Sequence, residues 1–291
     1  MTGIICGIKR MEIHDGDGIR TTVFFKGCPL RCLWCHNPES VSPHPEIALF
    51  DNKCIGCGEC RAACPSGAAK GGRIERELCT QCGSCANACP TGAITLFGER
   101  WDDEKLFECV MKDAPFFKNS GGGVTLSGGE CLMQADFALA LAKRFSTSGI
   151  SVNIDTSGYT DRRIIESILP YTDTFLYDVK AADPARHKAL TGRDNGRIID
   201  NLRYLSDVGA KIEVRVPLVT GLNDMEAHSI GELLAPLNVR GVKVLRYHDY
   251  ARSRYTALGI KDTMPRTSTS ESDVEEFVSV LRSFGIRAYS G

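Results

Sequence analysis

Six short apolar segments along the chain have the pattern of β-strands. They lie at residues 21–25, 123–127, 151–155, 174–179, 211–217 and 241–247. Between the later segments, residues 135–149, 162–170, 197–209 and 225–237 carry apolar side chains at three- and four-residue intervals, which indicates amphipathic helices. The alternation predicts an α/β fold with a mostly parallel sheet and right-handed crossovers. Because six strands are too few to close a barrel of the eight-stranded type, we expect a partial (β/α)6 barrel.

Residues 51–98 interrupt this alternation with an internal repeat. The segment CIGCGECRAACPSGAA begins at Cys54, and CTQCGSCANACPTGAI begins at Cys79. Each half has the spacing C-x2-C-x2-C-x3-C-P, which in bacterial ferredoxins binds two [4Fe–4S] clusters, with the fourth cysteine of each run crossing to the other cluster. This rule assigns one cluster to Cys54, Cys57, Cys60 and Cys89, and the other to Cys79, Cys82, Cys85 and Cys64.

The repeat predicts a ferredoxin-like insert at 51–98 that separates two parts of the barrel, residues 1–50 and 99–291. Zinc is the alternative ligand, since four thiolates also suit a tetrahedral ion.

A third cysteine group, in GCPLRCLWCHNPES, follows the first predicted strand and contains only Cys28, Cys32 and Cys35. Three thiolates leave one iron of a [4Fe–4S] cluster with an open coordination position, where a ligand can bind. In parallel sheets the ligand lies at the C-terminal ends of the strands. Near these ends the chain carries Gly128, Gly129, Glu130, Asp155, Thr156, Asp178, Lys180, Arg215 and His248. We expect these residues to converge with the three cysteines, and Lys180 and Arg215 to suit a carboxylate ligand.

Composition narrows the class of protein. The 291 residues include 35 basic and 36 acidic ones, so charge gives no reason to expect nucleic-acid binding. No run of about eighteen apolar residues predicts a membrane span, and residues 1–20 do not resemble a signal peptide. Of the 14 cysteines, eleven lie in the three-cysteine loop and the insert, which favours metal ligation in a reducing compartment over disulfides. We therefore expect a cytoplasmic metalloprotein.

Several motifs together resemble the glycyl-radical enzyme activating enzymes of the radical S-adenosylmethionine superfamily. The three-cysteine loop, with an aromatic residue before its last cysteine, and the later SGGE are similar to the superfamily as a whole. The segments DGDGIRTTVFFKGCPLRCLWCHNPES, GGVTLSGGE, DTSGY, DVKAADPARHKALTGRDN and YHDYARSRYTALG resemble the activating enzymes over nearly the whole chain. The insert resembles that of the larger members, such as activators of glycerol or choline lyases and of arylacetate decarboxylases.

The resemblance implies a barrel of the radical S-adenosylmethionine type and an oxidoreductase reaction. A reduced cluster would cleave S-adenosylmethionine to methionine and a 5′-deoxyadenosyl radical, which would abstract hydrogen from a backbone glycine of a partner protein. The resemblance also implies a role for each site residue. The catalytic cluster would be held by Cys28, Cys32 and Cys35, and the methionine amine would be met by Gly128, Gly129 and Glu130. The carboxylate and ribose side would be contacted by Lys180, Arg215 and His248, a monovalent cation would be held by Asp155, Thr156 and Asp178, and the partner's glycine loop would be oriented by Asp15.

The implied partner is a glycyl-radical lyase, dehydratase or decarboxylase. A flavodoxin or ferredoxin would donate electrons through the insert, and the insert would bring the total to three [4Fe–4S] clusters. Two other functions stay open: a radical enzyme that matures another protein, such as a sulfatase, and an electron carrier, which would not need the long strand-helix pattern after Cys89. Asp15 could instead be a turn residue before Gly16, and Asp155 a helix cap.

Overall fold

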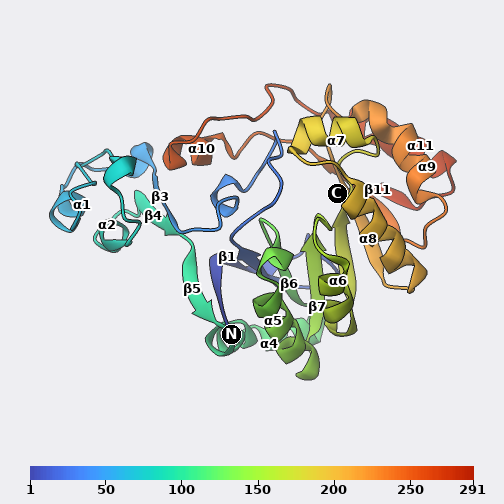
Figure 1. Cartoon of the computed structure of the whole chain (residues 1–291), viewed down its shortest axis with the longest axis horizontal. Helices are drawn as coiled ribbons and strands as arrows, with labels where there is room; N and C mark the ends of the chain where they lie inside the picture. Colours follow the sequence, from blue (N-terminus) through green and yellow to red (C-terminus); the bar gives the residue numbers. More distant parts are fainter.

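The computed structural model describes residues 1–291 and is built on one mixed nine-stranded sheet (Figure 1). The strands, in the order in which they pair, are β11 (Ala288–Ser290), β10 (Gly241–Arg246), β9 (Ile212–Leu218), β8 (Thr174–Asp178), β7 (Ser151–Thr156), β6 (Gly123–Gly128), β2 (Arg20–Phe25), β1 (Thr2–Glu12) and β5 (Glu99–Asp102). Neighbours from β11 to β2 pair in parallel, whereas β1 is antiparallel to both β2 and β5. The predicted α/β fold with a mostly parallel sheet is confirmed.

The six predicted strands are β2, β6, β7, β8, β9 and β10, and every end lies within one residue of its predicted position. The apolar pattern does not predict β1, β5 or β11. In β1 the second half is polar and largely exposed, and the strand forms by pairing with β2 and β5. Its polar half pairs with β2, the next strand in the chain, and its first half with the distant β5, so the strand depends on cross-strand pairing, which a local apolar pattern cannot register.

Four helices match the expected amphipathic segments: α5 (Ala135–Thr147), α6 (Arg162–Ile168), α8 (Gly196–Asp207) and α9 (Ala227–Leu234). Both α6 and α9 end two residues before a proline, Pro170 and Pro236, since proline disfavours helical backbone in the residue before it. Five further helices are not among the expected segments: α3 (Asp103–Met111), α4 (Ala114–Ser120), α7 (Pro184–Thr191), α10 (Arg252–Leu258) and α11 (Glu271–Ser283). None of the helices has the length and apolar character that crossing a membrane requires.

Alternation along the strands separates an apolar face of the sheet from a polar one. In β7, Val152 and Ile154 are fully buried in the main apolar core. The residues between and after them, Asn153 and Asp155, project to the opposite face, where Asp155 lies 3.8 Å from Arg215 of β9. The face that carries the apolar core packs against the helices, and the other face carries charged side chains into the interior.

The cysteine-rich insert forms a separate lobe beside the main sheet (Figure 1). Its strand β4 (Ile94–Phe97) pairs in an antiparallel sheet with β3 (Glu46–Leu49), which lies just before the predicted start of the insert at residue 51, and its short helices are α1 (Glu59–Ala62) and α2 (Ser84–Asn87). The two halves repeat in structure as in sequence: each helix follows a glycine in the left-handed conformation, Gly58 with φ 82° and Gly83 with φ 80°. Thus the sequence repeat corresponds to a repeated loop and helix.

Candidate active site

A cavity of about 680 Å³ lies at the C-terminal ends of the parallel strands. Of the residues predicted to converge there, those that line it are Cys28, Cys32, Cys35, Gly128, Gly129, Asp155, Thr156, Asp178, Lys180, Arg215 and His248. Asp15, which only the resemblance implied, lines it as well. Glu130 does not line it. The strand-end rule therefore places almost the whole predicted set correctly, although the residues come from segments far apart in the chain.

The three-cysteine loop has no regular secondary structure and is held by backbone hydrogen bonds to other segments. The N–H groups on either side of Cys32, those of Arg31 and Leu33, donate to the carbonyls of Thr191 and Leu190 at 2.7 and 3.0 Å. These two carbonyls belong to the C-terminal end of α7, where carbonyls lack partners within the helix. The end of α7 thus fixes the backbone around Cys32.

All three thiols of the loop are buried enough to disfavour the thiolate. Burial raises the pKa of Cys28 and of Cys32, and it raises the pKa of Cys35 to about 12. A thiolate in such a place needs a nearby positive charge, which a metal centre provides. Lys180 also lies near Cys32 and lowers its pKa in part. Without a positive charge nearby, the neutral thiol is therefore the favoured form at all three positions.

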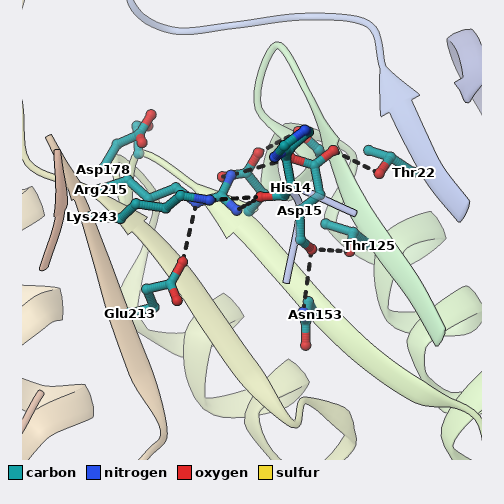
Figure 2. Close-up of polar contacts among 12 residues, drawn as sticks. His14, Asp15, Thr22, Thr125, Asn153, Asp178, Glu213, Arg215 and Lys243 are labelled. Atoms are coloured by element: carbon teal, nitrogen blue, oxygen red, sulfur yellow. Dashed lines mark hydrogen bonds and ion pairs between the residues drawn. The ribbon is translucent and has the colours of Figure 1, made fainter. Parts of the chain in front are cut away.

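Asp15 and Arg215 both line the cavity and contact each other (Figure 2). The Asp15 carboxylate accepts a hydrogen bond from the Thr22 hydroxyl at 2.8 Å, and its other oxygen lies 3.4 Å from Arg215 Nη1. Arg215 Nη2 donates to the His14 carbonyl at 2.9 Å. The Nε of Arg215 is buried without a hydrogen-bond partner. The Glu213 carboxylate lies 3.7 Å from this Nε, so it pairs with the guanidinium charge without forming a hydrogen bond.

Two further carboxylates line the wall next to Arg215. Asp155 accepts a hydrogen bond from the Ser127 hydroxyl at 2.6 Å, and Asp178 accepts one from Lys180 at 2.5 Å. Burial raises the pKa of Asp155 to about 7, although the Arg215 charge acts in the opposite direction. A bound cation would lower this pKa again, because it favours the charged form.

The side chain of Glu130 lies beneath the cavity wall and is 1% exposed. Its carboxylate accepts hydrogen bonds from the Thr156 hydroxyl at 2.8 Å and from the Ser157 hydroxyl and amide at 2.6 and 2.9 Å. Its two glycine neighbours are needed for packing: an added Cβ would lie 2.1 Å from the Phe25 nitrogen at Gly128 and 2.4 Å from the Gly27 carbonyl at Gly129. The motif at residues 128–130 thus packs against the backbone at 25–27 and is hydrogen-bonded to residues 156–157, so it brings three segments of the chain together.

At the rim of the cavity, His248 stacks on His36 with ring centroids 4.2 Å apart. Nε2 of His36 also donates to the His248 carbonyl at 2.6 Å, which links the three-cysteine loop to the chain after β10. Burial lowers the pKa of His36 to about 4, so the ring is neutral at physiological pH. The one hint of this contact along the chain is the position of His36 directly after Cys35.

The insert contains two smaller cavities, and each is lined by four cysteines. One set is Cys54, Cys57, Cys60 and Cys89, and the other is Cys64, Cys79, Cys82 and Cys85. These are the two sets that the crossing rule assigns, with one cysteine of each coming from the other half of the repeat. No three His, Cys, Asp or Glu side chains in the chain are arranged to hold a single metal ion.

Sequence reasoning missed the hydroxyl and amide groups that hold the charged residues. Thr22, Thr125 and Ser127 are buried polar residues on β2 and β6, and they contact Asp15 or Asp155. A signal was available in β6, where Thr125 and Ser127 interrupt the apolar strand two residues apart. Tyr255 was also missed; its hydroxyl donates to the Cys35 carbonyl at 3.0 Å from a segment 220 residues away.

Known proteins share both the sequence and the fold. The chain matches the Radical SAM superfamily over residues 22–234. It is 39% identical to the choline trimethylamine-lyase activating enzyme of Oleidesulfovibrio alaskensis over 97% of this chain and 95% of that protein. It is 41% identical to the trans-4-hydroxy-L-proline dehydratase activating enzyme of Clostridioides difficile, covering 88% and 87%. With the pyruvate formate-lyase 2-activating enzyme of Escherichia coli the identity is 34%, covering 99% and 92%.

Among solved structures, a domain of the pyruvate-formate lyase-activating enzyme from Bacteroides vulgatus aligns with a TM-score of 0.51 and 26% identity, over 59% of this chain and 99% of that one. Streptococcus suis SuiB bound to its precursor peptide SuiA aligns with a TM-score of 0.57 over 91% of this chain and 46% of that one, and at 12% identity it shows the fold alone. Together with the cavity, these matches show that the chain belongs to the radical S-adenosylmethionine superfamily and, within it, to the activating enzymes of glycyl-radical enzymes.

Proposed function

We propose that this activating enzyme cleaves S-adenosylmethionine reductively in the large cavity and then takes hydrogen from a backbone glycine of a lyase, dehydratase or decarboxylase. The observation that carries the proposal is the convergence of the three-cysteine loop with Gly128, Gly129, Lys180 and Arg215 in one cavity. When bound, a [4Fe–4S] cluster and S-adenosylmethionine supply the electron and the organic radical. The protein supplies three thiolate ligands, charged side chains that line the cavity, and an opening through which the partner's glycine loop enters.

Each side chain of the cavity has a proposed task. Cys28, Cys32 and Cys35 act as the thiolate ligands. Lys180 and Arg215 are cationic groups for the methionine carboxylate, and His248 at the rim contacts the ribose side. Asp155, Thr156 and Asp178 present oxygen atoms on the adjacent strands β7 and β8, which suits a monovalent cation.

For Glu130 the contacts favour an indirect role. Its carboxylate is occupied by Thr156, Ser157 and Leu132, so it stabilises the turn after β7. The backbone of Gly128 and Gly129, which does line the cavity, is then the part of the motif that meets the methionine amine.

We further propose that the insert carries two [4Fe–4S] clusters and passes electrons from a flavodoxin or ferredoxin. The two four-cysteine cavities support this, because each is lined by the ligand set that the ferredoxin rule assigns. The β3–β4 hairpin and the repeated loop and helix are consistent with a ferredoxin-like lobe.

The partner's glycine loop enters, in this proposal, where the sheet is open. The six parallel strands β2 and β6 to β10 would form the partial barrel, since the outermost strands β5 and β11 do not pair with each other. Asp15 lines the cavity just before β2, with its carboxylate exposed in part. From there it can accept hydrogen bonds from backbone N–H groups of an inserted loop.

The test combines the anaerobically reconstituted protein, S-adenosylmethionine, a reductant and a candidate glycyl-radical enzyme. We expect methionine, 5′-deoxyadenosine and a glycyl-radical signal in electron paramagnetic resonance (EPR). Cys32→Ala should abolish all three even with dithionite, whereas Cys57→Ala should reduce them mainly when flavodoxin or ferredoxin is the donor. Absence of 5′-deoxyadenosine with the wild type would refute the proposal, and equal losses in both variants with dithionite would refute the conducting role of the insert.

A further inference from the structure

Helix α10 lies between the insert and the three-cysteine loop (Figure 1). On the side of the loop, the Tyr255 hydroxyl donates to the Cys35 carbonyl at 3.0 Å. Arg254 donates to the next carbonyl, that of His36, at 3.2 Å, and to the Glu39 carboxylate at 2.6 Å. The helix therefore holds the backbone that leaves the third cysteine.

On its other side, α10 is bound by Arg76 of the insert. Although part of the Arg76 side chain is exposed, its guanidinium donates to the Ile47 carbonyl of β3 at 2.8 Å and to the Ala257 carbonyl of α10 at 2.7 Å. The second carbonyl is near the C-terminal end of the helix, where a cation is favourable. After it comes Gly259, with φ 65°, where an added Cβ would lie 2.3 Å from Arg76 Nε. Only a residue without a side chain allows the guanidinium this close.

Apolar contact supports the same junction. Ala257 and Leu258 of α10 and Ala48 of β3 are buried together, with Phe50 after β3 and Phe97 of β4 packed against them. Arg76 also reaches the cysteines of the insert, since its carbonyl accepts a hydrogen bond from the N–H of Cys79 at 3.2 Å. Arg76 thus connects the backbone of one four-cysteine cavity to the helix that holds Cys35.

We propose that Arg76 is a positioning residue for the catalytic loop: it fastens α10 to the insert, and α10 in turn holds the backbone after Cys35 in the shape that S-adenosylmethionine binding requires. The inference rests on the proposed function of the cavity. It gives the insert a mechanical role in addition to electron transfer. An experiment can separate the mechanical role from electron transfer. Dithionite delivers electrons without the insert, but it cannot restore a hydrogen bond that Arg76 no longer makes.

The experiment compares Arg76→Ala with Arg73→Ala, a control in the same loop whose guanidinium contacts only Glu75. Hydrogen exchange is measured over residues 252–258, and S-adenosylmethionine affinity is measured by titration of the reconstituted, dithionite-reduced protein. With Arg76→Ala we expect exchange in α10 about tenfold faster and affinity about three- to tenfold weaker, since two charge-assisted hydrogen bonds are lost. Arg76→Lys should recover part of both losses, because an ammonium can reach one of the two carbonyls. Arg73→Ala should behave as the wild type.

A second measurement asks whether Arg76 acts through α10. Tyr255→Phe removes only the hydroxyl that contacts Cys35, so its effect on affinity should not add to that of Arg76→Ala if both act on the same loop. Wild-type exchange and affinity in Arg76→Ala would overturn the proposal, as would additive effects or a defect confined to reactions with a protein donor. If the wild type fails to cleave S-adenosylmethionine, the proposed function fails; if only the Arg76 effects are missing, that function stands and the positioning role falls.

Discussion

At the cavity, each charged side chain is held by a group that limits its motion. Lys180 is bound by Asp178 at 2.5 Å, and Arg215 lies among Asp15, Asp155 and Glu213 at 3.4 to 3.8 Å. The nearby carboxylates raise the pKa of Arg215, which burial alone would lower. Such partners orient charges before a ligand arrives, so less ordering is needed on binding.

Asp15→Asn should separate partner recognition from cofactor binding. The asparagine oxygen can still accept from Thr22, and Arg215 keeps Asp155 and the His14 carbonyl, so S-adenosylmethionine affinity should change little. Glycyl-radical yield should fall by about tenfold or more, because a charge-assisted hydrogen bond to the partner contributes roughly 1.5 to 3 kcal/mol.

Spectroscopic titration measures the affinity and EPR measures the radical yield, with Asp17→Asn as the control because Asp17 is exposed and pairs only with Arg240. A wild-type yield in Asp15→Asn would exclude Asp15 from partner recognition. Loss of affinity would instead assign it to the cofactor pocket.

Glu130→Gln should destabilise the protein. Each oxygen of the buried carboxylate accepts two hydrogen bonds. In glutamine an NH2 group replaces one oxygen, and its N–H groups would face two groups that also donate. We expect the free energy of unfolding to fall by about 2 to 4 kcal/mol, as measured by denaturant titration. Glu232→Gln, exposed on α9 and in contact with His228, should be neutral. Equal stability of the two variants would show that the turn after β7 does not depend on Glu130.

At the scale of the elements, the segments that form the active site are fixed mainly by contacts at the ends of strands and helices. The carbonyls at the end of α7 hold the loop around Cys32, and the turn after β7 is held by Glu130. Inside that end of α7, the ring of His187 is 2% exposed and its Nδ1 donates to the Arg193 carbonyl at 2.6 Å. His187 therefore ties the helix end to the chain that follows.

His187→Ala should loosen the three-cysteine loop without touching a cysteine. The lost hydrogen bond and the space left in the interior should cost about 2 kcal/mol in stability. Iron in the catalytic site should be removed faster by a chelator, as followed by absorbance, while the insert keeps its iron. The control His228→Ala changes an exposed histidine of α9. Iron release at the wild-type rate would argue against support of the loop by α7.

For the whole molecule, the arrangement of two cysteine regions on one chain sets the expected metal content. Eight cysteines line the two cavities of the insert, and three line the large cavity. Three [4Fe–4S] clusters correspond to about twelve irons per chain after anaerobic reconstitution. Iron analysis of the wild type should find this amount, and changing all four cysteines of one insert cavity to serine should lower it by about four. A content of only about four irons in the wild type would refute the cluster assignment of the insert.

The sequence by itself determined the six parallel strands, the cysteine sets and the positions of the residues near the strand ends. These features are local: an apolar run, a fixed cysteine spacing or a strand end is read within a few residues. Even the convergence at one cavity followed, because parallel strands place their C-terminal ends along one edge of the sheet.

Only the tertiary structure decided which groups support that cavity. The contacts of Glu130 with Ser157, of Tyr255 with Cys35 and of Arg76 with Ala257 join segments from 27 to 220 residues apart. β1 also depends on pairing and not on an apolar pattern, since its polar half forms a strand by pairing with β2. Hydrogen bonds of this kind depend on where folded segments meet in space, and no spacing along the chain encodes them.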